Sequence, residues 1–166
     1  MEYTETVLNE GQTRRVWEKM VEAEVRSFYF ADLASRYTRY KQIISGATFF
    51  LSSGAAASVI GRSPNWVPVV LALLSALASA YSIAVGLDRR ASALAKLHAD
   101  WNALQSGYER LWNHWYEDSA EQTWEELRKQ AHSVSDRATT EAPRPDDKLI
   151  DEWAKTVYSR YGQAAA

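Results

Sequence analysis

Two uncharged stretches decide the fold: QIISGATFFLSSGAAASVIG at residues 42–61 and VPVVLALLSALASAYSIAVGL at residues 67–87. At ~1.5 Å per residue, each spans ~30 Å as a helix, the thickness of the hydrocarbon core of a bilayer. Gly, Pro and Asn between the stretches favour a turn, and Pro64 and Pro68 suit a helix start. The two stretches therefore predict a transmembrane hairpin, with a lipid bilayer as its first partner.

The charged residues lie almost entirely outside these stretches. Arg62 is the only charged residue among the 46 between Lys41 and Asp88, although the chain has 19 basic and 21 acidic residues. Basic residues flank both spans, at Arg36, Arg39 and Lys41 before the first and at Arg89, Arg90 and Lys96 after the second. Because Lys and Arg are enriched in cytoplasmic flanks, we expect an inner (plasma) membrane protein, multi-pass, with both termini cytoplasmic.

A buried helical hairpin in a soluble bundle is the alternative interpretation. Ala and Ser are frequent in the first stretch, and only 11 of its residues are apolar. Two adjacent uncharged runs of full membrane length, flanked by positive charge, favour the bilayer.

Small residues recur on several faces of the predicted spans. One set, suited to close helix packing, comprises Ala72, Ala76, Ala80, Ala84, Ser53 and Ala57. A second set carries hydroxyl groups and comprises Ser45, Thr48, Ser52, Ser75, Ser79 and Ser82. The hydroxyl residues either pack helix on helix or line a wet pathway in a homo-oligomer. Neither span holds a charged residue or a histidine, which disfavours a proton relay or an ion-coupled transporter.

The segment after the second span has a heptad pattern typical of a helical bundle or oligomer seam. Its seam residues are Leu94, Leu97, Trp101, Leu104, Tyr108, Leu111 and Trp115. We expect one helix to continue from the second span to Trp115. The N-terminal segment supplies an apolar face as partner, and it should run into the first span without a break because no Gly or Pro occurs between Gly11 and Gly46.

The remaining sequence predicts two shorter helices. Thr123-x-x-Glu126 has the spacing of a capping box, and Asp146 or Asp147 can cap the last helix after a Pro143-Arg144-Pro145 break. The apolar face of the last helix either folds back onto the bundle or docks another chain. The predicted all-α chain therefore divides into an N-terminal amphipathic helix (1–41), a transmembrane hairpin (42–87), a heptad helix with the helix after it (88–142), and a linker with the C-terminal helix (143–166).

Catalytic and ligand-binding motifs are absent from the sequence. The chain has no Cys, its three His residues lack metal-ligand spacing, and no phosphate loop or nucleophile elbow occurs. We therefore expect no enzyme activity, no catalytic or metal-binding residues and no cofactor. The net charge is −2, so the chain lacks the excess of positive charge that nucleic-acid-binding proteins have, and we expect no nucleic-acid partner.

The architecture resembles the SLATT family, two-transmembrane effectors of bacterial anti-phage defence systems. The resembling parts are Ala34-Ser35-Arg36-Tyr37 before the first span, the hairpin, and Ala95-Lys96-Leu97-His98-Ala99-Asp100-Trp101 followed by Tyr108-Glu109-Arg110-Leu111. The resemblance covers residues 17–120. It implies a pore-forming effector that oligomerises and breaches the inner membrane when a defence-system sensor or nucleotide-signal partner reports infection.

Two functions follow as hypotheses. The first is an oligomeric membrane effector that permeabilises the inner membrane in abortive infection. The second is a membrane scaffold or adaptor that recruits a soluble partner protein. A constitutive channel or transporter subunit is disfavoured by the uncharged spans.

Overall fold

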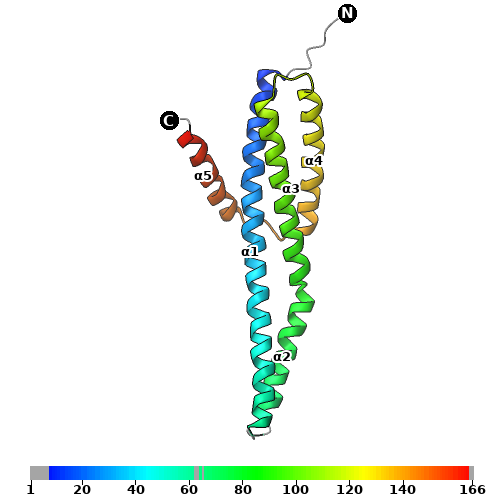
Figure 1. Cartoon of the computed structure of the whole chain (residues 1–166), viewed down its shortest axis with the longest axis vertical. Helices are drawn as coiled ribbons and strands as arrows, with labels where there is room; N and C mark the ends of the chain where they lie inside the picture. The colour runs from blue at the N-terminus through cyan, green and yellow to red at the C-terminus, as the bar shows by residue number, and fades with distance from the viewer. Residues whose placement is uncertain (1–7, 62–63, 65, 165–166) are drawn as a thin grey trace, which may run out of the picture. The chain divides into compact units, whose positions relative to one another are not determined.

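The computed structural model describes residues 8–61, 64 and 66–164. These residues form five helices and no strand (Figure 1): α1 (Glu10–Ile60), α2 (Trp66–Val85), α3 (Leu87–Asn113), α4 (Ala120–Glu141) and α5 (Asp147–Ala164). The predicted all-α fold is thus confirmed. Arg62, Ser63 and Asn65 of the predicted turn lie outside the described residues.

The chain divides into two compact units. The bundle unit comprises Met1–Asp32 and Ala93–Ala166, and the hairpin unit comprises Leu33–Ser92. The hairpin unit is longer than the predicted segment 42–87, because the helix segments beyond the uncharged stretches also pair. An ion pair between Lys41 and Asp88 lies in this added part.

Helix α1 runs without interruption for 51 residues, as the lack of Gly and Pro before Gly46 predicts. Its start is a capping box that the sequence reading overlooked. The Gln12 amide N–H donates to Asn9 Oδ1 at 2.8 Å, and the Asn9 amide N–H donates to Gln12 Oε1 at 2.9 Å. These two bonds satisfy backbone donors that have no partner within a helix.

The expectation of one continuous helix from the second span to Trp115 is wrong. Gly86 has a φ of +62°, in the left-handed region, and separates α2 from α3. Its amide N–H donates to the Ile83 carbonyl at 3.0 Å, and its carbonyl accepts from Arg90 as α3 begins. Only glycine adopts this conformation without steric cost, so Gly86 ends one helix and starts the next.

The core of the bundle unit lies between the N-terminal part of α1, α3 and α4. Tyr108 of α3 is fully buried, stacks at a tilt on Trp124, and donates its hydroxyl to the Leu127 carbonyl at 3.4 Å. Gly107 lies so close to α4 that a Cβ at this position would be 2.6 Å from Leu127 Cδ2. The absence of a side chain at Gly107 therefore sets how closely α3 and α4 approach.

Helix α4 begins four residues earlier than the predicted capping box at Thr123 implies. Ser119 precedes its first residue and makes no side-chain cap bond. Thr123 instead lies inside the helix and donates its hydroxyl back to the Ser119 carbonyl at 2.9 Å. The prediction failed because a threonine hydroxyl bonds the carbonyl four residues earlier as readily as it caps.

Helix α5 packs on α1, so its apolar face folds back onto the bundle. Asp146 caps it, accepting from the Leu149 amide at 3.3 Å as predicted. Trp153 stacks on Phe28 with ring centroids 5.1 Å apart, and the Tyr161 hydroxyl donates to Glu24 at 2.7 Å. The C-terminal helix is therefore held by aromatic stacking and by a charge-assisted hydrogen bond.

Candidate functional site

The hairpin unit presents an apolar surface. Two helical stretches, Glu10–Val59 and Trp66–Asn113, are long and apolar enough to cross a membrane. In their most apolar windows, 0% and 6% of the residues are buried inside the chain. A core helix of a soluble protein is mostly buried, so the alternative of a buried soluble hairpin does not describe these helices.

Hydroxyl groups form hydrogen bonds between the two helices of the hairpin. Ser52 Oγ and Ser75 Oγ lie 2.7 Å apart, and Ser75 Oγ lies 3.5 Å from the Thr48 carbonyl oxygen. Ser75 has one proton, so when it donates to Thr48 the Ser52 hydroxyl donates to Ser75. Ser75 is the one buried residue of α2. These hydrogen bonds join α1 to α2 within the hairpin unit.

The six predicted hydroxyl residues do not share one environment. Ser75 is buried, Thr48, Ser79 and Ser82 are half-buried, and Ser45 and Ser52 are exposed. Gly54 contributes to the same interface, because a Cβ there would lie 3.6 Å from Leu71 Cδ1. In this conformation the Thr48–Ser52–Ser75 group packs helix on helix, and it lines no lumen within the single chain.

The predicted small-residue packing set lies on the outer surface of the hairpin unit. This set includes the four residues that we call the alanine ridge: Ala72, Ala76, Ala80 and Ala84. All four are exposed, and so are Ser53 and Ala57 of α1. The alanine ridge therefore takes no part in closing the hairpin.

Of the two interpretations of the heptad pattern, the bundle seam with the N-terminal helix as a partner is confirmed for six of the seven residues, and the oligomer seam is wrong for these six. Leu94, Leu97, Trp101, Leu104, Tyr108 and Leu111 are each at most 4% exposed in the core of the bundle unit. They pack within the chain against α1 and α4, so they are not available to a second copy. Trp115 alone remains exposed, beyond the end of α3.

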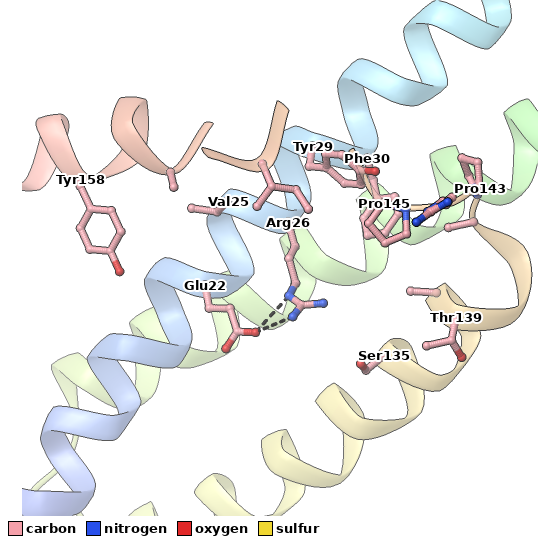
Figure 2. A pocket seen from close by; sticks show the side chains of 15 residues that line it. Glu22, Val25, Arg26, Tyr29, Phe30, Ser135, Thr139, Pro143, Pro145 and Tyr158 are labelled. Atoms are coloured by element: carbon pink, nitrogen blue, oxygen red, sulfur yellow. Dashed lines mark hydrogen bonds and ion pairs between the residues drawn. The ribbon is translucent and has the colours of Figure 1, made fainter. Parts of the chain in front are cut away.

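A cavity of about 650 Å³ lies in the bundle unit under the linker between α4 and α5. We call it the linker cavity (Figure 2). Its walls are Val25, Tyr29 and Phe30 of α1, Ser135, Ala138 and Thr139 of α4, the linker residues 142–145, and Ile150, Ala154 and Tyr158 of α5, with Glu22 and Arg26 at one side. The sequence reading overlooked this cavity. The Pro143-Arg144-Pro145 break was the available signal, because two prolines hold an extended connection that keeps α5 off α4.

The polar part of the linker cavity is an ion pair on α1. Arg26 Nε and Nη2 lie 3.0 and 2.8 Å from Glu22 Oε1, and Lys19 Nζ donates to Glu22 Oε2 at 2.6 Å. Burial raises the pKa of the Glu22 carboxyl. The Lys19 hydrogen bond and the charges of Arg26 and Lys19 outweigh it and hold the pKa below its ordinary value. Glu22 is thus an anion over the physiological range.

Tyr29 closes the linker cavity near the start of α5. Its hydroxyl accepts a hydrogen bond from the Asp146 amide at 3.2 Å. Figure 2 shows Ser135 and Thr139 of α4 across the cavity from Arg26. The cavity has the size of small-molecule sites and their usual composition, with an apolar wall and a few polar groups.

An aromatic surface lies where α3 ends in the bundle unit. Trp17, Trp112 and Trp115 line a shallow hollow together with Glu10, Thr13 and Arg14. Trp112, Trp115 and Tyr116 are 36%, 42% and 60% exposed. Exposed tryptophans of this kind are frequent in protein interfaces.

His98 makes a polar contact between two helices of the bundle unit. Its Nδ1 lies 3.0 Å from both the hydroxyl and the carbonyl oxygen of Ser27, so it links α3 to α1. Within the described residues, no group of three or more His, Asp and Glu side chains is arranged to hold a metal ion.

No protein family model matches the chain, and neither do the curated proteins and solved structures with which it was compared. The resemblance to the SLATT family therefore stays a prediction.

Proposed function

We propose that this chain is an oligomeric effector of the inner membrane. The observation that carries the proposal is the exposed apolar surface of the hairpin unit, including Phe50 at 75% and Ile83 at 81% exposure. Burying one such side chain contributes about 1.5–3 kcal/mol, so a surface of this extent supports placement of the hairpin unit in lipid. The basic residues flanking both spans support cytoplasmic termini.

Assembly of several copies through the alanine ridge is the second part of the proposal. Lipid tails do not drive apolar helices together, so association depends on close van der Waals contact between small side chains. The ridge is exposed over four turns of α2 and is not used within the chain. The alanine ridge therefore suits close contact with a second copy of this chain.

Permeabilisation requires a rearrangement of the hairpin. The Ser52 and Ser75 hydroxyls face one another in the described conformation, which makes this the closed state under the proposal. A signal that separates α1 from α2 would expose these hydroxyls to water in an oligomer. The resemblance to the SLATT family supports anti-phage defence, with a sensor or nucleotide-signal partner as the source of the signal.

Induced expression with a membrane-potential dye tests the effector function. We expect depolarisation with the wild-type chain, alone or with its genomic partner, and reduced depolarisation for Ala76→Leu, whose side chain blocks close approach on the ridge. Val70→Leu is the matched control, because Val70 is exposed on α2 ~120° around the helix from Ala76. Full membrane potential at high wild-type expression contradicts the proposal.

A membrane adaptor that recruits a soluble partner is the second candidate. The exposed Trp112, Trp115 and Tyr116 favour it, because Trp and Tyr dominate the energetics of protein interfaces. Co-purification separates the two functions. The adaptor requires a stoichiometric soluble partner that is lost in Trp112→Ala and retained in Ala76→Leu, with no change in membrane potential.

A further inference from the structure

A second cavity of about 240 Å³ adjoins the linker cavity in the bundle unit. Glu22, Arg26 and Ser135 line both cavities. Lys19 of α1 and Arg128 of α4 complete the charged lining of the smaller one. We call it the basic cavity, because its walls carry three permanent cations and one carboxylate.

The single carboxylate does not neutralise this lining. Glu22 is bound by Lys19 and Arg26 together, so one of those two charges is in excess. Arg128 pairs with Glu125, which does not line the basic cavity. In the described part of the chain only Nε and Nη2 of Arg26 are engaged by Glu22, which leaves Nη1 for another acceptor.

The indole of Trp101 adds a neutral donor. Trp101 lines the basic cavity, is 4% exposed, and lies under the Arg26 guanidinium, 4.9 Å from its ring centroid. Its Nε1–H is buried and has no hydrogen-bond partner among the described residues. Buried indole N–H groups usually have an acceptor, so this donor is available to a polar atom of a ligand in the basic cavity.

We propose that the two cavities form one binding site for a small organic anion. Its phosphate or carboxylate group lies among Lys19, Arg26 and Arg128, since guanidinium groups pair with oxyanions through parallel N–H donors. Its flat or apolar body lies in the linker cavity, against Tyr29 and Pro143. The site stands on the geometry of the bundle unit alone, whatever the hairpin does in a membrane.

Occupancy bears directly on α5. The linker cavity is lined by the linker residues 142–145 and by Ile150, Ala154 and Tyr158 of α5, while the basic cavity is lined by α1, α3 and α4. One ligand in both cavities therefore bridges four helices of the bundle unit and ties α5 to α1.

Titration of the full chain in a neutral, lipid-free detergent tests the site. Three probes separate the two parts of the ligand. Phenyl phosphate carries both the phosphate group and the apolar ring, inorganic phosphate lacks the ring, and phenol lacks the phosphate charge. We expect phenyl phosphate to bind saturably and more tightly than either fragment. A short-chain phosphatidylglycerol, added separately, distinguishes a lipid headgroup from a free anion as the source of the phosphate. If it binds with the same dependence on Arg26 and Arg128, the oxyanion site is supported with a lipid as its source.

Charge-removing variants locate the binding. Arg26→Gln should weaken the affinity for phenyl phosphate about tenfold or more, which is the loss expected when one charge-assisted contact is removed. Arg128→Gln gives the same test at an exposed position that leaves the core intact. Arg14→Gln is the matched control, because Arg14 also lies on α1 beside a Glu four residues away but lines neither cavity.

A steric pair tests the shared wall. Ser135→Phe places a bulky side chain at the wall that both cavities share and should abolish binding, whereas Ser133→Phe on the exposed side of α4 should not. The proposal is overturned if none of the anions binds saturably up to about 10 mM, the weak limit of useful affinity. It is equally overturned if Arg26→Gln, Arg128→Gln and Arg14→Gln all bind alike.

Discussion

The hydroxyl oxygens of Ser52 and Ser75 lie 2.7 Å apart and join the two helices of the hairpin unit. They come from positions 23 residues apart in the sequence, on either side of the turn. The same hydroxyls had two interpretations in the sequence, as packing contacts or as the lining of a wet pathway. Their mutual hydrogen bond fixes the first for the described conformation and makes the second conditional on parting the helices.

A bulky side chain at Ser75 should open the hairpin. Ser75→Leu overpacks a buried site, at a cost of about 1–3 kcal/mol, and removes a hydroxyl bond worth roughly 0.6 kcal/mol in a membrane. The chain has no cysteine, so disulfide cross-linking of a Gly54→Cys/Leu71→Cys pair reports the contact between α1 and α2 without competing native thiols. We expect strong cross-linking of this pair in the parent and weak cross-linking with Ser75→Leu.

The same substitution at a neighbouring exposed position is the control. Ser53 is exposed on α1, so Ser53→Leu should leave the cross-linking of the cysteine pair unchanged. Equal cross-linking in all three proteins would show that Ser75 does not hold the helices together.

Gly107 and Leu127 should behave as a coupled pair. Gly107→Ala places a methyl group 2.6 Å from Leu127 Cδ2, and overpacking of about 1–3 kcal/mol outweighs a gain in helix propensity of about 1 kcal/mol. In a Leu127→Ala background the clash is gone and only the propensity remains. We therefore expect Gly107→Ala to lower the thermal midpoint of the full chain and to raise it in the Leu127→Ala background. The same sign in both backgrounds would disprove the steric account.

The sequence was sufficient for the all-α class and for two helical stretches that are long and apolar enough to cross a membrane, because both depend on local pattern. The lack of Gly and Pro predicted the continuous α1, and the cap of α5 is Asp146, one of the two residues predicted for it. The break at Gly86 was missed because glycine is also common at close helix contacts, and nothing local distinguishes the two uses.

The linker cavity, and the surface against which the heptad residues of α3 pack, both depend on contacts between distant segments of the chain. The repeat of Leu94 and Leu97 suited both a bundle seam and an oligomer seam, and the structure shows that the facing surface comes from the same chain. Arg26 and Arg128 lie 102 positions apart in the sequence, and only the fold places both in one cavity. A heptad pattern specifies an apolar face and leaves its partner undetermined.

The hydrogen bond from Tyr161 to Glu24 should stabilise α5 against α1. Burial, with the Glu24 hydrogen bond and charge as further causes, raises the pKa of the Tyr161 hydroxyl, so it remains a donor at neutral pH. Tyr161→Phe removes the donor and should speed amide exchange in Asp147–Ala164 by about tenfold, a value typical of a bond to a charged group. Tyr158→Phe is the control, since Tyr158 packs on Trp17 through its ring. A similar effect of both variants would mean that ring packing alone holds α5.

Acid should weaken the bundle unit through Glu22. Its pKa is lowered from 4.5 in the folded chain, because Lys19 and Arg26 stabilise the carboxylate more than burial disfavours it. A carboxyl with a depressed folded pKa stabilises the fold above its unfolded pKa, and this contribution is lost as pH falls through the folded pKa. We expect the thermal midpoint of the full chain to exceed that of Glu22→Gln by a constant margin from pH 7 to pH 5, and the margin to shrink below pH 4.5. Glu18→Gln, at the more exposed pair with Arg14, should show a smaller margin throughout. A Glu22→Gln margin that persists unchanged to about pH 3 would assign the effect to lost packing, since linkage requires the contribution of the charge to shrink once the pH falls below the unfolded pKa.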